Sequence, residues 1–520
     1  MPIFELNIPA GMSNNGTSDQ SEMRWEGGSM VRWANGSMEP IGGFQVDTDI
    51  SGTASIRARK AIAWNDNDGS AWVAYGKSGY ISARQKGGIA YDITPTDLYS
   101  SPYTQPINDE YVVTISMANW GQNLLMCDNY DRRIYEWSPQ TPTTKAVRIT
   151  TANGYIDDAP INNEAVFVTG ERFVFALGAD GDPRRVAWCD FEDIGIWTPS
   201  STNQAGDITL DAEGSLRCGV TFSDMNVLLT DDELFVARYV GPPYIFNFEK
   251  VSSGCGVISN NAAVTTPAGV FWMGKNNFYV FNGASVSSIP CQVRDSVFND
   301  FAPENLIYDP KKLIWAFHNA SYNEVWWFYA RNNAQDGYDL GSYVIYNYAE
   351  GTWATGGDDV PGETSQVKQY SGLSRLPRTC GFGPEVWGKT VWFGNRVFEH
   401  EIVGGDFEPD VSGPNAGGSA YSFAMSAPFY ISPSKNLVLA TQLLQDVENS
   451  TDAELWFYTK NYPNDTEVRF PAYGSGTYTL ANPTDIRVTG RQFRAVLRMK
   501  DGQRMKVGKF IFDVQGNGRR

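Results

Sequence analysis

The chain has 520 residues, of which 19% are charged and 13% aromatic. Each aromatic ring removes about 150–250 Å² from water when it is buried, so this composition predicts a large core and excludes a disordered chain. Rings and β-branched residues favour strands, which argues against a helical bundle. No run reaches the ~18 uninterrupted apolar residues of a membrane span, and the start, MPIFELNIPAG, lacks the features of a secretion signal.

The formal net charge of −18 argues against a protein that holds nucleic acid through its overall field. The charge is uneven, because residues 481–520 contain ten basic and three acidic residues and carry +7. The rest of the chain therefore carries −25. This contrast fits either a solvated basic strand face or a docking surface for an acidic neighbour.

Residues 1–50 predict two short strands around the Asn35-Gly36 turn, in RWEGGSMVRWANGSMEPIGGF. We assign this segment to a platform module that it shares with the other end of the chain.

Residues 51–405 repeat a pattern of apolar, aromatic strands separated by turns such as NDNDG, GKNN, TDDE and ADGD. Gly, Asn and Asp tolerate positive φ, so these turns suit hairpins. Equivalent strand positions recur every 44 to 66 residues, at Ile62, Val113, Val166, Val220, Val264, Ile314 and Gly381. A period of about 50 residues is typical of a four-stranded propeller blade. The sequence thus predicts an all-β protein with a β-propeller of about seven blades (six to eight); stacked β-sandwiches are the competing interpretation.

Residues 406–419, DFEPDVSGPNAGGS, are rich in Pro, Gly and Ser and predict a linker. Residues 420–520 then alternate in strand fashion. In FRAVLRMK, Phe493 and Leu497 share one face while Arg494 and Arg498 share the other, and GKFIFDV returns after a turn at Asp501. This pattern predicts an antiparallel, sandwich-like module that completes the platform.

The basic side chains of this module would lie on its outer face. We predict that they form the surface that meets a protein partner, and the candidate residues are Arg487, Arg491, Arg494, Arg498, Lys500, Arg504 and Lys506.

The sequence contains no recognisable catalytic or metal-binding motif. There are two histidines, His318 and His400, for which we expect structural roles, and no GxSxG, HExxH or P-loop motif is present. The six cysteines show no CxxC spacing, and reduced, buried thiols are expected. We therefore predict no catalytic residue, no metal site and no cofactor.

Four segments contain residue types found in functional sites, but each favours a structural interpretation. Asp66–Trp72 resembles a sialidase Asp-box only imperfectly and fits an ordinary hairpin turn, and a calcium loop fails there because Trp64 would fill a ligand position. Asp180-Gly-Asp-Pro-Arg-Arg185 fits an exposed turn with local ion pairs. The aromatic runs 326–329 and 343–348 could form a sugar platform, but core packing is the favoured interpretation.

Several long segments resemble a family of tail proteins of short-tailed bacteriophages, described as tail nozzle, tail tubular or packaged-DNA stabilisation proteins. They include GADGDPRRVAWCDFEDIGIWTP, ARYVGPPYIFNFEKVSSGCGVISNNAAV, GVFWMGKNNFYVFNG, NEVWWFY, YNYAEGTWATG and the terminal TGRQFRAVLRM with FIFDVQGNGRR. The opening NIPAG and RWEGGSMVRWANGSMEPIGGF fit the start of the same family. The similarity extends over the whole chain and contains no active-site motif.

The resemblance implies a structural virion protein, made in the host cytoplasm and built into the phage tail. It implies a homohexameric ring below the head-to-tail adaptor, fibres or spikes attached outside, and a plug or needle at the distal end. Such a nozzle retains packaged DNA and passes it to the host on ejection. The family implies no enzyme activity.

Charge agrees with a conduit that DNA crosses without stable binding. Six copies would carry −108, and acidic residues on a lumen would repel a duplex that has one charge per ~1.7 Å. Screening limits the effect to about 8–10 Å, so only carboxylates that face the lumen would contribute. The alternative function is a propeller that binds or cleaves carbohydrate, which predicts an exposed aromatic floor beside convergent carboxylates.

Overall fold

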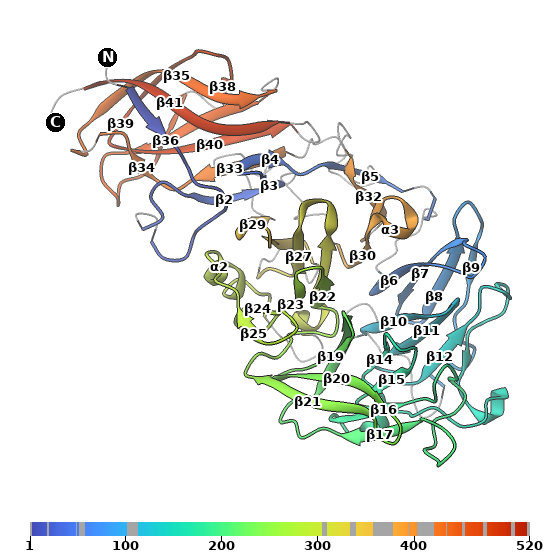
Figure 1. The fold of residues 1–520 in the computed structure, drawn as a ribbon. Helices are drawn as coiled ribbons and strands as arrows, with labels where there is room; N and C mark the ends of the chain where they lie inside the picture. The colour runs from blue at the N-terminus through green and yellow to red at the C-terminus, as the bar shows by residue number, and fades with distance from the viewer. Residues whose placement is uncertain are drawn as a thin grey trace.

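The computed structural model describes residues 3–17, 20–47, 49–50, 58–100, 113–303, 309–332, 340–356, 378–394, 396–402, 421–432, 434–449, 453–471, 476–500 and 505–516. The predicted linker, 406–419, lies outside these residues. Strands make up nearly all the regular structure of the described chain, which contains seven four-stranded antiparallel sheets and two larger sheets. Figure 1 shows the four-stranded sheets in one body and the two larger sheets together in another, next to both chain termini.

The four-stranded sheets are the blades of a propeller. Blade 1 contains β6 (Lys60–Asn65), β7 (Ala71–Lys77), β8 (Tyr80–Gln85) and β9 (Ala90–Asp92); blade 2 β10 (Ile115–Trp120), β11 (Asn123–Asp128), β12 (Ile134–Trp137) and β13 (Val147–Arg148); blade 3 β14 (Ala165–Val168), β15 (Val174–Leu177), β16 (Arg185–Trp188) and β17 (Gly206–Thr209); blade 4 β18 (Leu216–Phe222), β19 (Met225–Thr230), β20 (Glu233–Gly241) and β21 (Ile245–Ser253); blade 5 β22 (Ala263–Thr266), β23 (Gly269–Met273), β24 (Phe278–Phe281) and β25 (Val286–Ser288); blade 6 β26 (Trp315–Asn319), β27 (Glu324–Tyr329), β28 (Ser342–Asn347) and β29 (Thr352–Gly356); blade 7 β30 (Cys380–Phe382), β31 (Thr390–Phe393), β32 (Val397–Ile402) and β5 (Gly43–Val46).

The innermost strands form a closed ring. Each of β6, β10, β14, β18, β22, β26 and β30 contacts the next, and β30 contacts β6. A small sheet cannot bury both faces alone, so each blade packs on its neighbours around this ring. The prediction of about seven blades is confirmed, and stacked sandwiches are excluded for this part of the chain.

Blade 7 is completed by an outer strand from near the start of the sequence. β5 pairs with β32, so that blade 7 combines residues 380–402 with residues 43–46. The expected assignment of all of residues 1–50 to the platform therefore fails at its last strand. The turn residues around Asn35 predicted the pairing of β3 with β4. They did not indicate which sheet the next strand, β5, would join.

The platform is a sandwich of two sheets built from both chain ends. Sheet A has the order β3-β4-β41-β35-β39, with β1 also paired to β41; sheet B has the order β2-β33-β40-β36-β37, with β34 paired to β40 and β38 to β36. The strands are β1 (Ile3–Leu6), β2 (Trp25–Ser29), β3 (Val31–Ala34), β4 (Ser37–Pro40), β33 (Tyr421–Ser426), β34 (Phe429–Tyr430), β35 (Val438–Glu448), β36 (Glu454–Lys460), β37 (Val468–Phe470), β38 (Tyr478–Thr479), β39 (Thr484–Gly490), β40 (Gln492–Lys500) and β41 (Lys506–Gly516).

The predicted alternation in the C-terminal strands is confirmed. Phe493, Leu497 and Met499 of β40 are buried in the same core cluster as Phe510 and Phe512 of β41. Such period-two burial is what a sandwich requires, because each strand sends alternate side chains into the space between the sheets.

Helices are short and lie in connections. They are η1 (Thr151–Asn153), η2 (Ala179–Gly181), α2 (Arg294–Phe298), η3 (Pro310–Leu313), η4 (Ala320–Tyr322) and α3 (Pro384–Trp387). Among the described residues, no helix is long and apolar enough to cross a membrane.

Candidate functional site

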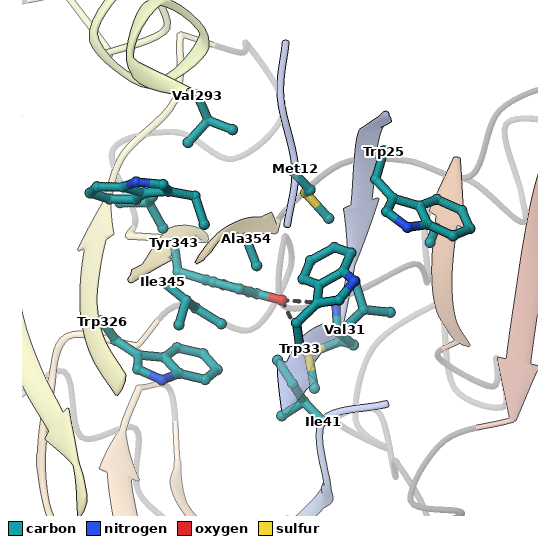
Figure 2. Packing of buried hydrophobic residues seen from close by; sticks show 14 of the residues in the cluster. Met12, Trp25, Val31, Trp33, Ile41, Val293, Trp326, Tyr343, Ile345 and Ala354 are labelled. Atoms are coloured by element: carbon teal, nitrogen blue, oxygen red, sulfur yellow. Dashed lines mark hydrogen bonds between the residues drawn. The ribbon is translucent and has the colours of Figure 1, made fainter. Parts of the chain in front are cut away.

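The platform and the propeller share one hydrophobic core. A single cluster of buried residues runs from sheets A and B into blades 4, 5 and 6. Figure 2 shows the middle of this junction, where Tyr343 of β28 points toward Trp33 and Val31 of the platform. The Tyr343 hydroxyl accepts a hydrogen bond from the Met30 backbone N–H at 2.8 Å. The two bodies are therefore packed as one unit.

A buried ionic network crosses the same junction. Arg32 of β3 donates from Nη2 to Glu324 of β27 at 3.1 Å and from Nη1 to Glu401 of β32 at 2.9 Å. The guanidinium also lies 3.6 Å from the centre of the Tyr322 ring. Trp326 Nε1 adds a hydrogen bond to Glu324 at 2.9 Å. One platform side chain thus connects blades 6 and 7.

Burial sets the electrostatics of this network. Desolvation alone would lower the pKa of Arg32, but Glu324 and Glu401 raise it overall, so the guanidinium stays charged. Burial raises the pKa of Glu324 to about 7, although Arg32 acts in the opposite direction. Sequence reasoning missed these three residues, because 292 positions separate Arg32 from Glu324 and no local motif connects them. A charged residue within each apolar segment, VRWA and NEVWW, is the one signal that the sequence offers.

The predicted basic surface divides between the two faces of the platform. Arg494 and Arg498 lie on sheet B, whereas Arg487 on β39 and Lys506 on β41 belong to sheet A, and Arg491 lies at the turn between β39 and β40. The side chain of Lys500 and all of Arg504 lie outside the described residues. The structure therefore brings Arg494 and Arg498 together but does not place all the basic residues on one face.

Arg494 and Arg498 already have acidic partners within the chain. Arg494 lies 3.0 Å from Glu26 of β2, and Arg498 Nε donates to Glu454 of β36 at 2.9 Å. Arg498 also lies over the Trp456 ring, at 5.6 Å. Their exposed fractions are only 15% and 14%. These two arginines stabilise the outer face of sheet B, and the charge available to a partner comes from the other basic residues.

Neither histidine lies in a catalytic arrangement. His400 is buried, and its Nε2 accepts a hydrogen bond from Arg378 Nε at 2.9 Å. Burial, and then the Arg378 charge, hold the pKa of His400 well below its ordinary value, so the ring is neutral. His318 Nε2 lies 3.1 Å from the Tyr348 hydroxyl, and burial lowers its pKa as well. Both rings pack against aromatic neighbours.

One end of the propeller axis carries a polar network that joins several blades. Lys60 at the start of β6 donates to Asn261, before β22, at 2.9 Å. Glu164 accepts from Asn260 at 3.0 Å and from Arg217 at 3.2 Å, which connects blades 3, 4 and 5. Burial lowers the pKa of Lys60. These hydrogen bonds connect the blades at the starts of their innermost strands.

The thiols at this end are poor nucleophiles. Cys218 and Cys380 are buried, and burial raises the pKa of each to about 12, although Lys60 acts in the opposite direction. All six cysteines are free thiols; five are buried, as expected from the sequence, and Cys291 is half-buried. Within the described residues, no group of three or more His, Cys, Asp or Glu side chains could hold a metal ion.

The two polar turns, at residues 66–72 and 180–185, make contacts within their own blades. Asp66 accepts from the Ser70 N–H at 2.8 Å and from Trp72 Nε1 at 2.9 Å, which fixes the β6–β7 hairpin. Arg185 forms ion pairs with Asp180 at 2.9 Å and with Asp207 at 3.2 Å in a half-exposed turn.

Most rings of the two aromatic runs in blade 6 belong to the core, although Tyr346 and Tyr348 are half-buried. Trp326, Trp327, Phe328 and Tyr343 are each at most 1% exposed. Trp326, Phe328 and Tyr343 pack on one another, and Trp326 and Phe328 also pack on Trp392. An aromatic floor for a saccharide must be open to solvent, so these rings cannot form one.

The similarity of this chain to known proteins is weak. No family model matches the chain, and no curated protein matches it. Among solved structures, a catalytically inactive virginiamycin B lyase from Staphylococcus aureus with quinupristin is 9% identical, with a TM-score of 0.38, covering 69% of this chain and 99% of that one. The computationally designed Ika8 protein is 11% identical, with a TM-score of 0.36 and coverages of 76% and 99%. The Neurospora crassa Pan2 WD40 domain is 8% identical, with a TM-score of 0.35 and coverages of 71% and 96%. The propeller assignment itself rests on the seven sheets and their closed ring.

Proposed function

We propose that this chain is a structural subunit of a short phage tail, which assembles as a hexameric nozzle, retains packaged DNA and conducts it on ejection. The proposal begins with the resemblance of segments along the whole chain to tail nozzle proteins. It names the head-to-tail adaptor, tail fibres or spikes, and a distal plug as partners, and it includes no catalytic step.

One observation carries most of the argument from structure: the shared core and the buried Arg32 network join the platform to blades 6 and 7. A domain pair that only tethers a binding module usually has a smaller, more polar interface. A ring subunit exposed to the pressure of packaged DNA needs a rigid connection between its ring-forming parts. The junction supplies that rigidity.

Two further features favour this function over carbohydrate cleavage. The aromatic run 326–329 and Tyr343, which could have stacked on sugars, are buried, and the two histidines are neutral, packed side chains. The net charge of −18 also suits a wall along which a polyanion slides, provided that acidic residues face the lumen.

The test is negative-stain microscopy of the purified chain mixed with the adaptor ring of its phage, with each component alone as the control. We expect sixfold rings attached to the adaptor. Monodisperse monomers that leave the adaptor bare and shorten a polysaccharide would contradict the proposal and support the alternative function.

A further inference from the structure

A lysine of blade 1 and an asparagine of blade 5 meet at the propeller axis. Lys60 is the first residue of β6, and Asn261 lies just before β22 (Figure 1). Lys60 Nζ donates a hydrogen bond to Asn261 Oδ1 at 2.9 Å, although 201 positions separate the two residues. Blades 1 and 5 are not neighbours, because blades 6 and 7 lie between them on one side of the ring and blades 2, 3 and 4 on the other. The contact therefore links separate parts of the propeller.

The Lys60 side chain lacks the acidic partner that a desolvated cation usually has. Among the residues that the structure describes, no carboxylate forms an ion pair with it. Burial lowers the pKa of Lys60, and the thiols of Cys380 and Cys218 offset only part of this effect. A larger share of the side chain is then the neutral amine than in an exposed lysine. The neutral amine is a nucleophile, and desolvation is one way in which proteins activate lysine.

The backbone around Asn261 is fixed, whereas its side-chain nitrogen is not. The Asn261 backbone oxygen accepts a hydrogen bond from the Ala316 N–H at 2.8 Å, and the oxygen of Ala262 accepts one from Trp327 Nε1 at 3.0 Å. Within the described part of the chain, Asn261 Nδ2 has no hydrogen-bond partner. Asn261 is half-buried, so a small product released from it can reach solvent. The fold thus holds an amine against a carboxamide at high effective concentration.

We propose that Lys60 and Asn261 form an intramolecular isopeptide bond, a covalent cross-link between blades 1 and 5. The neutral Nζ attacks Cγ of Asn261, so the Nζ–Cγ bond forms and the Cγ–Nδ2 bond breaks. One proton moves from Nζ to Nδ2, which leaves as ammonia, and Oδ1 remains as the carbonyl oxygen of the new amide. No atom is oxidised or reduced, and no other reactant is consumed.

The cross-link changes both the charge and the chain. A neutral amide replaces an ammonium group that is costly to hold without an acidic partner away from water. Joining positions 60 and 261 also restricts the unfolded chain, as a disulfide that closes a long loop does. The inference goes beyond the proposed function and does not depend on it, because the bond forms within one chain whether or not that chain assembles.

The first test is mass spectrometry of the unchanged full chain, freshly purified and after incubation of the folded protein for several days in mildly alkaline buffer. Among the described residues no carboxyl group contacts the pair, so we expect a slow reaction and an incubated chain that is lighter by one ammonia molecule. Trypsin cleaves after Lys and Arg but not after an acylated lysine, so peptide 60–77 should be joined to peptide 251–275. A folded chain that keeps its full mass, or one that loses ammonia without yielding the joined peptide, would overturn the proposal.

The second test assigns the nucleophile. Lys60→Met keeps a side chain of similar length but removes the amine, so this variant should retain its full mass. The matched control is Lys86→Met, since Lys86 follows β8 in blade 1 and donates to the backbone oxygen of Trp387 at 2.7 Å. The control should lose ammonia as the unchanged chain does. If Lys60→Met loses ammonia to the same extent as the control, the loss arises elsewhere and the proposal is wrong.

Two measurements keep these outcomes distinct from other failures. Thermal melts show whether both variants fold, and if Lys60→Met does not, the peptide map of the unchanged chain decides alone. Microscopy with the adaptor ring tests the nozzle separately. A cross-linked chain that forms no rings supports this inference and contradicts the proposed function, whereas rings built from chains of full mass support the proposed function and contradict the cross-link.

Discussion

Arg32 and Glu324 lie side by side in the structure, 2.9 Å apart from Nε to Oε1, although one belongs to the platform and the other to blade 6. Both side chains are at most 2% exposed. A buried pair of this kind costs desolvation energy, which the attraction between the charges repays only with good geometry. We infer that its main effect is to fix one docking of the platform on the propeller.

Replacing Arg32 with Met removes the cation and leaves two carboxylates facing each other. We expect a loss of about 3–5 kcal/mol in the free energy of unfolding, because a buried charge without a partner is costly. Urea denaturation followed by tryptophan fluorescence measures it.

The matched control is Arg185→Met. The ion pairs of Arg185 lie in a half-exposed turn, so we expect this variant to lose about 1 kcal/mol or less in the free energy of unfolding. In the triple variant R32M/E324Q/E401Q the carboxylates are neutral, so most of the lost stability should return. A triple variant as unstable as Arg32→Met would show that packing of the arginine stem, not charge, holds the junction.

Protonation of two buried carboxyls should add stability on mild acidification. Burial raises the pKa of Glu324 to about 7 and that of Asp128 to about 6, although Arg32 and Tyr99 oppose the two shifts. These values exceed those of the unfolded chain, so the folded state binds protons more tightly between about pH 7 and pH 4.5. The two carboxyls should therefore raise the melting temperature over this range, against the opposite contribution of His318 and His400, whose pKa values burial lowers.

The increase should end near pH 4. Burial acts to raise the pKa of Asp231 and Glu233, but hydrogen bonds with Arg217 and Lys250 hold both pKa values below their usual range, so their stabilisation is lost as they protonate. The double variant E324Q/D128N should flatten the rise between pH 7 and 5 while keeping the fall below pH 4. Thermal melts at constant ionic strength check both statements.

Closure of the propeller depends on Phe44 of β5. Its ring packs on Phe398 at 5.5 Å and on His400 at 5.2 Å, and Arg378 lies over it at 4.9 Å. Phe44→Ala should cost about 3–5 kcal/mol, as buried Phe-to-Ala changes do. Phe191→Ala, at a ring that is 46% exposed, should cost much less. Equal losses in the two variants, measured by urea denaturation, would contradict the role of β5 as the closing strand.

Gly356 at the end of β29 permits the close approach of Tyr343. A methyl group on Gly356 would overlap the Tyr343 ring, whose hydroxyl binds Met30 across the junction. Gly356→Ala should cost at least about 1–3 kcal/mol, the usual range for overpacking. Gly516→Ala is the control, since nothing lies within 4 Å of its added carbon. A melting temperature of Gly356→Ala equal to that of the control would contradict this packing.

The sequence predicted the repeated hairpins and the sandwich strands because these depend on local alternation and on turn residues such as Asn, Asp and Gly. It did not predict that β5 completes blade 7, since pairing between residues 46 and 398 depends on ring closure and leaves no local pattern. The Arg32 network was missed for the same reason. The basic surface was predicted from composition, and composition could not reveal that Glu26 and Glu454 would neutralise Arg494 and Arg498.

This division of the basic residues leads to a prediction about adaptor binding. Arg487 is exposed on β39, and Arg491 lies over Tyr462 at the next turn, at 5.3 Å. The double variant R487E/R491E should weaken binding to the adaptor ring, increasingly so at low salt, while the melting temperature stays within a few degrees. Arg498→Glu should instead lower the melting temperature, because it places a carboxylate beside Glu454 and removes the cation from the Trp456 ring. Binding by light scattering and thermal melts of the same samples separate the two effects. If R487E/R491E binds the adaptor as the unchanged chain does at every salt concentration, the predicted surface does not face the adaptor.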